Sequence, residues 1–277
     1  MTRSILALLF LSFSATASAQ FFYKDIITIK QAADELNRIK ANKVKTIRLK
    51  SFEDDGSASD GFFAEKKFSR DYRKAELFTR TNYSGASLLT TFYNEDGTIS
   101  RTVDSSEIAT THIQYKYDED KRLLSTLSVI RSADDDFVNE IVEEHLYVYT
   151  NEFYPDKMFR VKNRKDTTEI LFMLDENKNL SIEKDSRSGS KYYYYYDAKS
   201  RLTDVAHIND FRQKLLPDYM FEYNSAGLIT QMITTQEGGG GNDYLLWKYT
   251  YSDGLRMTEA CYSKERKLLG RIEYEYK

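Results

Sequence analysis

The sequence predicts a mainly β protein, an antiparallel meander of repeated β-hairpins with one short N-terminal helix. Three observations predict this fold class. The 277-residue chain has 22 tyrosines and 16 phenylalanines against one tryptophan, and both abundant residue types favour strands. Many segments alternate apolar and polar residues with a period of two. A turn-rich motif recurs along most of the chain, so we expect one long sheet of about 16 strands that curves or rolls to cover its aromatic face.

Composition limits the classes of function. Hydrophobic residues make up 41% of the chain, which is enough to bury a core and excludes disorder for most of its length. The 40 basic and 43 acidic residues give a net charge of -3, which offers no electrostatic case for a nucleic-acid partner. The single cysteine, Cys261, excludes a disulfide framework and a cysteine-built zinc site.

The first residues have the order of a secretory signal peptide. In residues 1–19, Arg3 precedes a short apolar run over 5–13, and Ala-Ser-Ala at 17–19 is a small-x-small cleavage site. A buried N-terminal helix is the alternative. We expect the mature chain to begin near Gln20 and to be exported to the periplasm or the medium. The apolar run is too short for a membrane span, and no cysteine follows the cleavage site, so neither a span nor a lipid anchor is expected.

Residues 20–61 are expected to form a cap made of a helix, a strand and an acidic loop. Apolar residues recur at helical spacing over 28–41, with Thr28 as the expected N-cap and Asn42 as the expected stop. The period then changes to two over 44–49, which predicts a strand. The acidic and small residues from Ser51 to Gly61 predict a loop. The helix is expected to pack at the first edge of the sheet or to plug that end.

Residues 62–277 are expected to form the repeat domain. The motif is an aromatic residue, any residue, a tyrosine and then Asp or Asn, followed by a short turn and an apolar residue. The clearest copies are YKYD at 115–118, YYYD at 194–197 and FEYN at 221–224. The anchor positions recur about every 26 residues, a period typical of repeat architectures. They are Tyr93, Tyr117, Tyr149, Leu174, Tyr196, Tyr223, Tyr251 and Tyr276.

Each repeat is expected to be one β-hairpin. The Asp or Asn after the anchor starts the turn by bonding to its own backbone, and Gly97 and Gly227 supply a positive φ. One stripe of tyrosines is expected to be mostly buried: Tyr117, Tyr196, Tyr223 and Tyr251. Their charged neighbours are expected to be exposed: Lys116, Glu222 and Lys248.

The motif resembles the YD repeat of Rhs and teneurin-type shells. The segment 194–203, YYYDAKSRLT, is similar to a complete copy of that signature, with Ser200 where the family prefers glycine. Lys121 takes the same place in the copy at 115–123, and Leu174 replaces one anchor tyrosine. The resemblance covers about residues 88 to 277. It implies a small exported bacterial member with a scaffold or binding role and without a toxin module.

The tyrosine run at 192–196 is the candidate ligand site. In a strand, Tyr193 and Tyr195 point away from the side that joins the core, so they are expected to form an exposed aromatic platform. Such rings stack on sugars or on peptide side chains. The alternative is that another layer, for example the N-terminal helix, covers them.

Other residues with chemical potential are expected to be structural. The three histidines lie in different expected strands, and Cys261 is expected to pack in a half-buried strand. The acidic runs at 53–55 and 134–136 lack the alternate spacing of a calcium loop, and the glycines at 238–241 precede a strand rather than a phosphate-binding helix. No catalytic residue, metal site or cofactor site is therefore expected.

The expected function is a non-enzymatic extracytoplasmic scaffold or binding module for protein or glycan. Two alternatives stay open. One is a glycan-directed hydrolase with a carboxylate pair in a cleft with aromatic walls. The other is an envelope assembly factor with an open apolar groove.

Overall fold

The computed structural model describes residues 21–134, 140–150, 154–209, 214–235 and 243–277. The predicted signal peptide 1–19 and the expected first mature residue, Gln20, lie outside the described residues. The same holds for Asp135 and Asp136 of the second acidic run and for the glycines at 238–241. Within the described part, no helix combines the length and the apolar character needed to cross a membrane.

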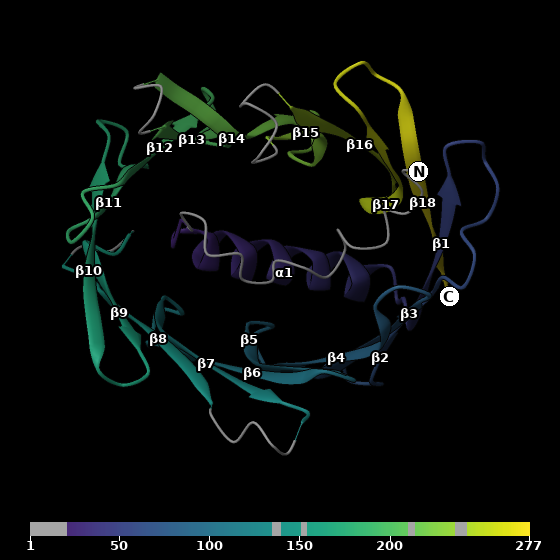
Figure 1. Cartoon of the computed structure of the whole chain (residues 1–277), viewed down its shortest axis with the longest axis horizontal. Helices are drawn as coiled ribbons and strands as arrows, with labels where there is room; N and C mark the ends of the chain where they lie inside the picture. Colours follow the sequence, from purple (N-terminus) through teal and green to yellow (C-terminus); the bar gives the residue numbers. More distant parts are fainter. Residues whose placement is uncertain (1–20, 135–139, 151–153, 210–213, 236–242) are drawn as a thin grey trace. The chain divides into compact units, whose positions relative to one another are not determined.

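The prediction of a mainly β meander with one N-terminal helix is confirmed (Figure 1). The described part contains 18 strands, slightly more than the sequence predicted. The elements are α1 (Lys24–Ala41), β1 (Thr46–Glu53), β2 (Phe63–Phe68), β3 (Lys74–Thr81), β4 (Gly85–Tyr93), β5 (Ile99–Ser106), β6 (Ala109–Tyr117), β7 (Leu123–Ser132), β8 (Ile141–Val148), β9 (Lys157–Lys162), β10 (Asp166–Leu174), β11 (Leu180–Asp185), β12 (Lys191–Tyr196), β13 (Leu202–Asn209), β14 (Lys214–Tyr223), β15 (Ile229–Thr235), β16 (Tyr244–Ser252), β17 (Leu255–Tyr262) and β18 (Leu268–Tyr276).

Consecutive strands pair with one another, and β1 pairs both with β2 and with β18. Each strand from β12 to β17 has a hydrogen-bonded neighbour on both sides. The pairing of β1 with the end of the chain is direct. The Lys45 and Thr46 amides donate to the Lys277 carbonyl at 2.7 and 2.9 Å, and the Lys277 amide donates to the Thr46 carbonyl at 2.9 Å.

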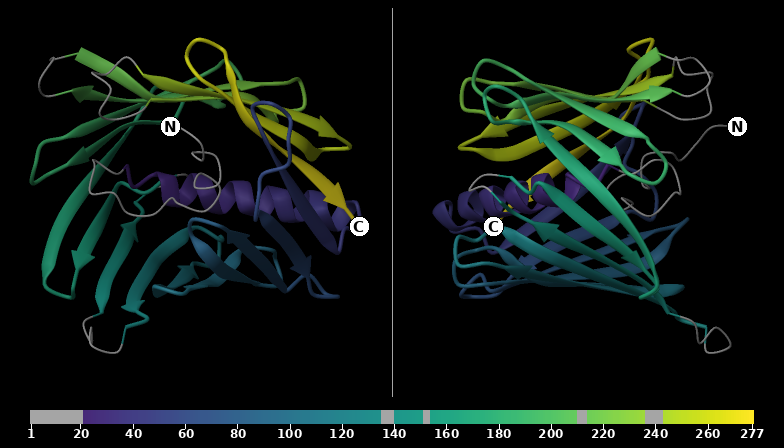
Figure 2. Two further views of the ribbon diagram at one scale, coloured as in Figure 1. Left: turned by 45° about the vertical axis from the view of Figure 1, so that its right-hand side comes forward. Right: turned by 90° about the vertical axis from the view of Figure 1, so that its left-hand side faces the viewer.

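The chain divides into two compact units. The N-terminal unit comprises Phe22–Lys50, Asp60–Ile170 and Glu275–Lys277, and so contains α1 and most of β1 to β10. In the described part, the C-terminal unit comprises Phe21, Ser51–Ser59 and most of Leu171–Tyr274, and so contains β11 to β17 and most of β18. Figure 2 shows the antiparallel strands of each unit side by side.

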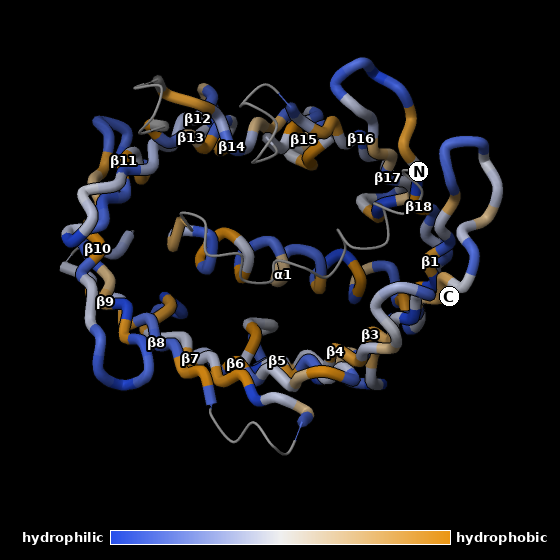
Figure 3. The backbone as a smooth tube through the Cα atoms, in the orientation of Figure 1, coloured by the Kyte–Doolittle hydropathy of each residue, from blue (hydrophilic) through white to orange (hydrophobic). Residues whose placement is uncertain are grey.

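In the N-terminal unit, α1 is an amphipathic helix with Leu36 and Ile39 buried. Figure 3 shows apolar and polar patches alternating along it. The predicted start at Thr28 is wrong, because the helix begins at Lys24 with Tyr23 as N-cap. Contacts of Asp25 with the sheet, described below, account for the extra turn. The predicted stop is correct, since the Asn42 amide and side chain both bond to the Arg38 carbonyl.

The predicted loop from Ser51 to Gly61 starts too early, because β1 continues through Glu53. The Ser59 amide donates to the Ser51 carbonyl at 2.9 Å, and the two serine hydroxyls bond to each other at 2.8 Å. Phe52 also forms a bridge with Ala58. These pairings fold the acidic segment back as a small hairpin, so its first three residues gain strand partners.

The anchor tyrosines mark a recurring hairpin turn. The pairing register shifts by a β-bulge immediately before Tyr93, Tyr117, Tyr196, Tyr223 and Tyr251. After the bulges at Tyr93, Tyr117, Tyr196 and Tyr223, the turn is closed by two backbone bonds. At Asp197, for example, its amide donates to the Arg201 carbonyl at 3.0 Å, and the Ser200 amide donates to the Asp197 carbonyl at 2.9 Å. This is a type I turn followed by a bulge residue in the left-handed region.

Non-glycine residues occupy this left-handed position in several turns. Gly97 and Gly227 adopt φ values of 90° and 81°, as the sequence predicts for glycine. Ser200 and Lys121 adopt φ values of 55° and 64°, although a side chain disfavours this region. The hairpin is therefore kept where glycine is missing, at the cost of local backbone strain.

Side chains connect each hairpin to the next. The Asp197 carboxylate accepts from the Arg201 amide at 3.0 Å and from its guanidinium Nε at 2.7 Å. The Arg201 guanidinium lies over the ring of Tyr223, the next anchor, at 4.8 Å. The Tyr223 hydroxyl donates to the Leu202 carbonyl at 2.6 Å.

The same connection recurs in the N-terminal unit. Arg122 bonds Asp118 at 2.6 Å and lies over the ring of Tyr149, whose hydroxyl donates to the Leu123 carbonyl at 3.0 Å. The hydroxyls of two further anchor tyrosines make the same kind of bond. Each donates to the carbonyl of the first residue of a strand in the preceding hairpin. They are Tyr117, to Ile99 at 2.8 Å, and Tyr251, to Ile229 at 2.7 Å. We call the bond from an anchor tyrosine hydroxyl to the preceding hairpin the anchor link. At Tyr149 and Tyr223 it includes the arginine that lies over the ring.

The predicted burial pattern holds in part. Lys116, Glu222 and Lys248 are exposed, as expected. The stripe tyrosines Tyr117, Tyr196, Tyr223 and Tyr251 are half-buried rather than mostly buried. The anchor link explains the difference for Tyr117, Tyr223 and Tyr251, because a ring whose hydroxyl reaches back to the previous hairpin lies along the sheet and keeps one side open.

Replacing Ser200 by glycine is expected to stabilise the protein. Glycine adopts the left-handed conformation without the steric cost that serine has there. This gain exceeds the larger conformational entropy that glycine loses on folding, so the free energy of unfolding should rise by up to about 1 kcal/mol. Lys199→Gly is the matched control, because Lys199 is not among the positive-φ residues, and it should lower the free energy of unfolding by roughly 0.5–1 kcal/mol. Denaturant unfolding measures both. A destabilised Ser200→Gly variant would contradict the turn geometry.

Removing the Tyr223 hydroxyl tests the anchor link. Tyr223→Phe leaves the ring in place and is expected to cost about 1 kcal/mol, because the Leu202 carbonyl loses its donor. Tyr223→Ala is expected to cost roughly 3 kcal/mol. The exposed control Lys116→Ala should cost well under about 1 kcal/mol. Equal thermal shifts for Lys116→Ala and Tyr223→Ala would show that the register is misassigned.

Candidate functional site

The predicted platform lies on β12 in the C-terminal unit. Tyr192 and Tyr194 are buried, Tyr193 is half-buried, and Tyr195 is 45% exposed. The alternation expected for a strand is therefore present along the tyrosine run. It leaves Tyr195 as the accessible ring.

The buried side of β12 is held by polar and aromatic contacts. The Tyr194 hydroxyl donates to the buried Glu183 carboxylate at 2.8 Å. The ring of Phe21 lies 5.8 Å from that of Tyr192 and 5.7 Å from that of Tyr219. The described N-terminal residue of this unit thus packs on the face opposite to Tyr195, so this contact does not cover the platform.

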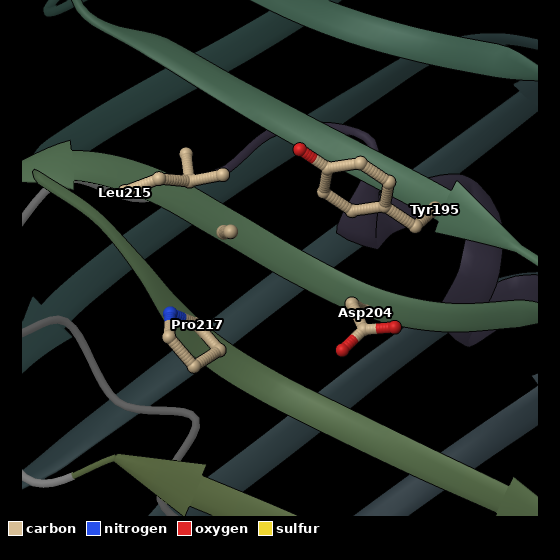
Figure 4. Close-up of a pocket in the computed structure, with 5 residues that line it drawn as sticks. Tyr195, Asp204, Leu215 and Pro217 are labelled. Atoms are coloured by element: carbon tan, nitrogen blue, oxygen red, sulfur yellow. The ribbon is translucent and has the colours of Figure 1, made fainter.

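Tyr195 lines a concave site of about 390 Å³ (Figure 4). The other lining residues are Asp204 and Ala206 on β13 and Leu215 and Pro217 on β14. Figure 4 shows the ring of Tyr195, the Asp204 carboxylate and the ring of Pro217 around one shared space. A register shift between Val205 and Ala206 places Ala206 opposite Pro217. The small Ala206 side chain then forms the floor between larger walls.

This arrangement suits a ligand with a flat apolar face and hydroxyl groups at its edge. The Tyr195 ring offers a stacking surface, and the adjacent Asp204 carboxylate accepts hydrogen bonds from hydroxyls. Among the described residues that line the site, Asp204 is the single carboxylate.

The sequence identified Tyr195 but not its partners. Asp204 pairs directly with Tyr195, and this pairing follows from folding the anchor at 196 into a hairpin. The contribution of Leu215 and Pro217 depends on the register shift inside β13, for which the sequence contains no signal. Tyr193 was expected beside Tyr195, but it does not line the site.

In the N-terminal unit, the buried His145 on β8 belongs to an ion-pair network whose other charged members are half-buried. Its Nδ1 lies 2.6 Å from the Asp25 carboxylate in the first turn of α1, and its Nε2 lies 2.9 Å from Glu143. Arg160 on β9 donates to the other Glu143 oxygen at 2.8 Å, and the Tyr147 hydroxyl donates to Asp25 at 2.8 Å. The network attaches the start of α1 to the sheet.

The network shifts two pKa values in opposite directions. Burial alone would lower the pKa of His145, but the facing Asp25 and Glu143 carboxylates raise it to about 9. Burial would raise the pKa of Glu143, but hydrogen bonds from His145 and Arg160 lower it to about 2. His145 is therefore a charged structural residue at neutral pH and not a general base.

The remaining candidate residues also have structural roles. His207 bonds Asp218 at 2.8 Å, and His112 pairs across the strands with Val103 and Val129, so the three histidines have different neighbours. Cys261 packs against Leu245 and Trp247, and burial raises the pKa of its thiol to about 12. Within the described ranges, no group of three or more His, Cys, Asp or Glu side chains is placed to hold a metal ion.

One buried carboxylate with charged and polar partners was not predicted from the sequence. Glu259 on β17 is 4% exposed and bonds Arg256 at 2.9 Å, and the Tyr274 hydroxyl donates to it at 3.1 Å. Burial raises the pKa of Glu259. The Arg256 guanidinium also lies 4.5 Å from the centre of the Tyr249 ring. The carboxylate is enclosed by fixed partners, which gives it a packing role.

Comparison with known proteins gives little guidance on function. No protein-family model matches the chain, and no curated protein matches it. Among solved structures, a porin-like protein from Bacteroides uniformis ATCC 8492 is 8% identical, with a TM-score of 0.41, covering 84% of this chain and 98% of that one. A porin-like protein from Bacteroides vulgatus ATCC 8482 is 13% identical over 84% and 98%, with a TM-score of 0.31. The structure of TcdB2-TccC3-Cdc42 is 8% identical over 82% of this chain and 19% of that one, with a TM-score of 0.26.

The two shifted pKa values predict a stability maximum between pH 4.5 and 6.5. His145 has its pKa raised from 6.5 to about 9, so its contribution is complete below pH 6.5 and is lost as the pH rises through 9. Glu143 has its pKa lowered from 4.5 to about 2, so its contribution is present above pH 4.5 and is lost on acidification towards 2.

Melting temperatures across this range measure the effect. His145→Gln is expected to flatten the alkaline decline, because glutamine does not titrate. His112→Gln is the matched control and should leave the decline unchanged, since His112 lies outside the network. An unchanged alkaline arm in His145→Gln would contradict the assignment.

Proposed function

We propose that this protein is a non-enzymatic, exported binding module that holds a glycan at the Tyr195 site. The proposal includes the interpretation of the chain as a small YD-repeat scaffold. The anchor links supply the rigid framework, and the site lies on three neighbouring strands of it rather than on a mobile loop. Sites built on strands hold their side chains more closely in place than sites on loops.

One observation carries the proposal. An exposed aromatic ring and a carboxylate share a concave surface whose remaining walls are apolar. In water, an exposed tyrosine ring gains free energy by covering its face with another apolar surface. A sugar ring offers such a face, and its hydroxyl groups can donate hydrogen bonds to the Asp204 carboxylate. A protein partner that added a strand would need a free sheet edge, and the strands of this site are paired on both sides.

Three carboxylates support binding over hydrolysis: Glu183 and Glu259 are buried, and Asp25 is half-buried. Glu183 is bonded by Tyr194, Glu259 by Arg256 and Tyr274, and Asp25 by His145 and Tyr147. A hydrolase needs an acid and a base that both reach the substrate. These groups are instead engaged with fixed neighbours, which favours a structural role for them.

A glycan-array screen followed by titration of the best ligand tests the proposal. Tyr195→Ala is expected to weaken binding about 10-fold or more, because a stacking contact of this kind is worth roughly 1 kcal/mol beyond the buried area. Tyr195→Phe should keep most of the affinity. Asp204→Ala should also weaken binding, because a hydrogen bond to a charged group contributes about 1.5–3 kcal/mol.

Tyr83→Ala is the matched control, since Tyr83 is 68% exposed in the other unit. Equal losses in Tyr83→Ala and Tyr195→Ala would argue against a specific site. If the protein turned over a glycan, and Asp204→Asn abolished this turnover without unfolding the protein, the protein would be a hydrolase and not a binding module.

A further inference from the structure

A second concave site of about 210 Å³ lies in the same unit, on β15, β16 and the turn after β17. Its apolar part consists of Ile233, Leu246 and Tyr244. Its charged part consists of Lys248, Lys264 and Arg266. The residues that line it include no carboxylate.

The three cations are only partly balanced by neighbouring acids. Lys264 lies 3.3 Å from Asp243 and 4.0 Å from Glu265. Lys248 lies over the ring of Tyr262 at 5.6 Å, a contact that leaves its charge in place. Arg266 is exposed and stands at the left-handed position of its turn, with φ of 63°. A concave surface with three cations and no lining acid attracts anions.

The two concave sites lie on one face of the sheet. Residues directly opposite each other on neighbouring strands share a face. A continuous row of such pairs runs Tyr195–Asp204–Met220–Ile233–Leu246. The row joins the Tyr195 ring to the apolar floor of the second site. Neighbouring strands lie about 4.8 Å apart, so the four spacings from β12 to β16 extend over roughly 19 Å.

The middle of the row is also accessible. Met220 is 39% exposed and lies between Asp204 and Ile233. The row therefore has an aromatic end, an apolar middle and a basic end. This order matches an extended ligand that crosses the strands, rather than two unrelated small molecules.

We propose that this row binds an acidic glycan, with one sugar ring on Tyr195 and a carboxylate group of another residue at Lys248, Lys264 and Arg266. The inference rests on the proposed function and adds the charge class and direction of the ligand. An acidic peptide fits less well, because β12 to β16 offer no edge for strand addition.

Calorimetric titration with a short oligogalacturonate and with its carboxyl-reduced counterpart tests the inference. The wild-type protein is expected to bind the acidic form about 10-fold more tightly, and the difference should shrink as salt is added. The double variant Lys248→Gln/Arg266→Gln should lose this preference and keep its affinity for the neutral form. Tyr195→Ala should weaken binding of both forms.

The control variant Lys116→Gln/Arg164→Gln removes two exposed cations from the other unit, and Arg164 also has a positive φ. It should bind as wild type does. A preference that persists in Lys248→Gln/Arg266→Gln overturns the acidic-glycan inference and leaves the proposed function intact. Failure to bind either oligosaccharide overturns the acidic-glycan inference, whereas absence of any ligand in the array screen overturns the proposed function. Equal affinity for an acidic peptide or an oligonucleotide overturns the assignment to a glycan.

Discussion

The structure depends on one repeated interaction, the anchor link between successive hairpins. An isolated two-stranded hairpin is only marginally stable in water, so each repeat needs support from its neighbour. A tyrosine hydroxyl that bonds a carbonyl of the preceding hairpin gives this support in a fixed register. The arginine above the ring is itself held by the aspartate of its own turn. Turn formation and the contact between hairpins are thereby coupled.

In the C-terminal unit, the two faces of the sheet carry different kinds of side chains. One face carries buried polar groups, which are costly unless each finds a partner. Glu183 with Tyr194, and Glu259 with Arg256, meet that requirement through fixed partners. The side chains on the face that carries Tyr195 are more exposed, for example Tyr195 and Met220, so water can satisfy their polar groups. Its apolar and charged side chains remain open to a ligand, which is why the proposed recognition surface lies there.

The sequence predicted the architecture better than the site, for physical reasons. Period-two alternation and recurring turns are local signals, so the meander, the stop at Asn42 and the exposure of Lys116 were all predictable. The start of α1 at Lys24 depends on the contact of Asp25 with His145, 120 residues later in the chain. The walls of the Tyr195 site depend on the register shift beside Ala206. Long-range pairings and bulges of this kind leave no local pattern.

The backbone bonds between Lys277 and the start of β1 have a consequence for biosynthesis. A chain is made from its N-terminus, so β1 is complete long before its second partner exists. Until the last residues emerge, β1 has one row of unpaired amides and carbonyls, a state prone to wrong pairing and proteolysis. Contacts between residues so distant in sequence also form slowly. Pairing of this part of β1 therefore waits for the segment around Lys277, whose amide and carbonyl are its partners.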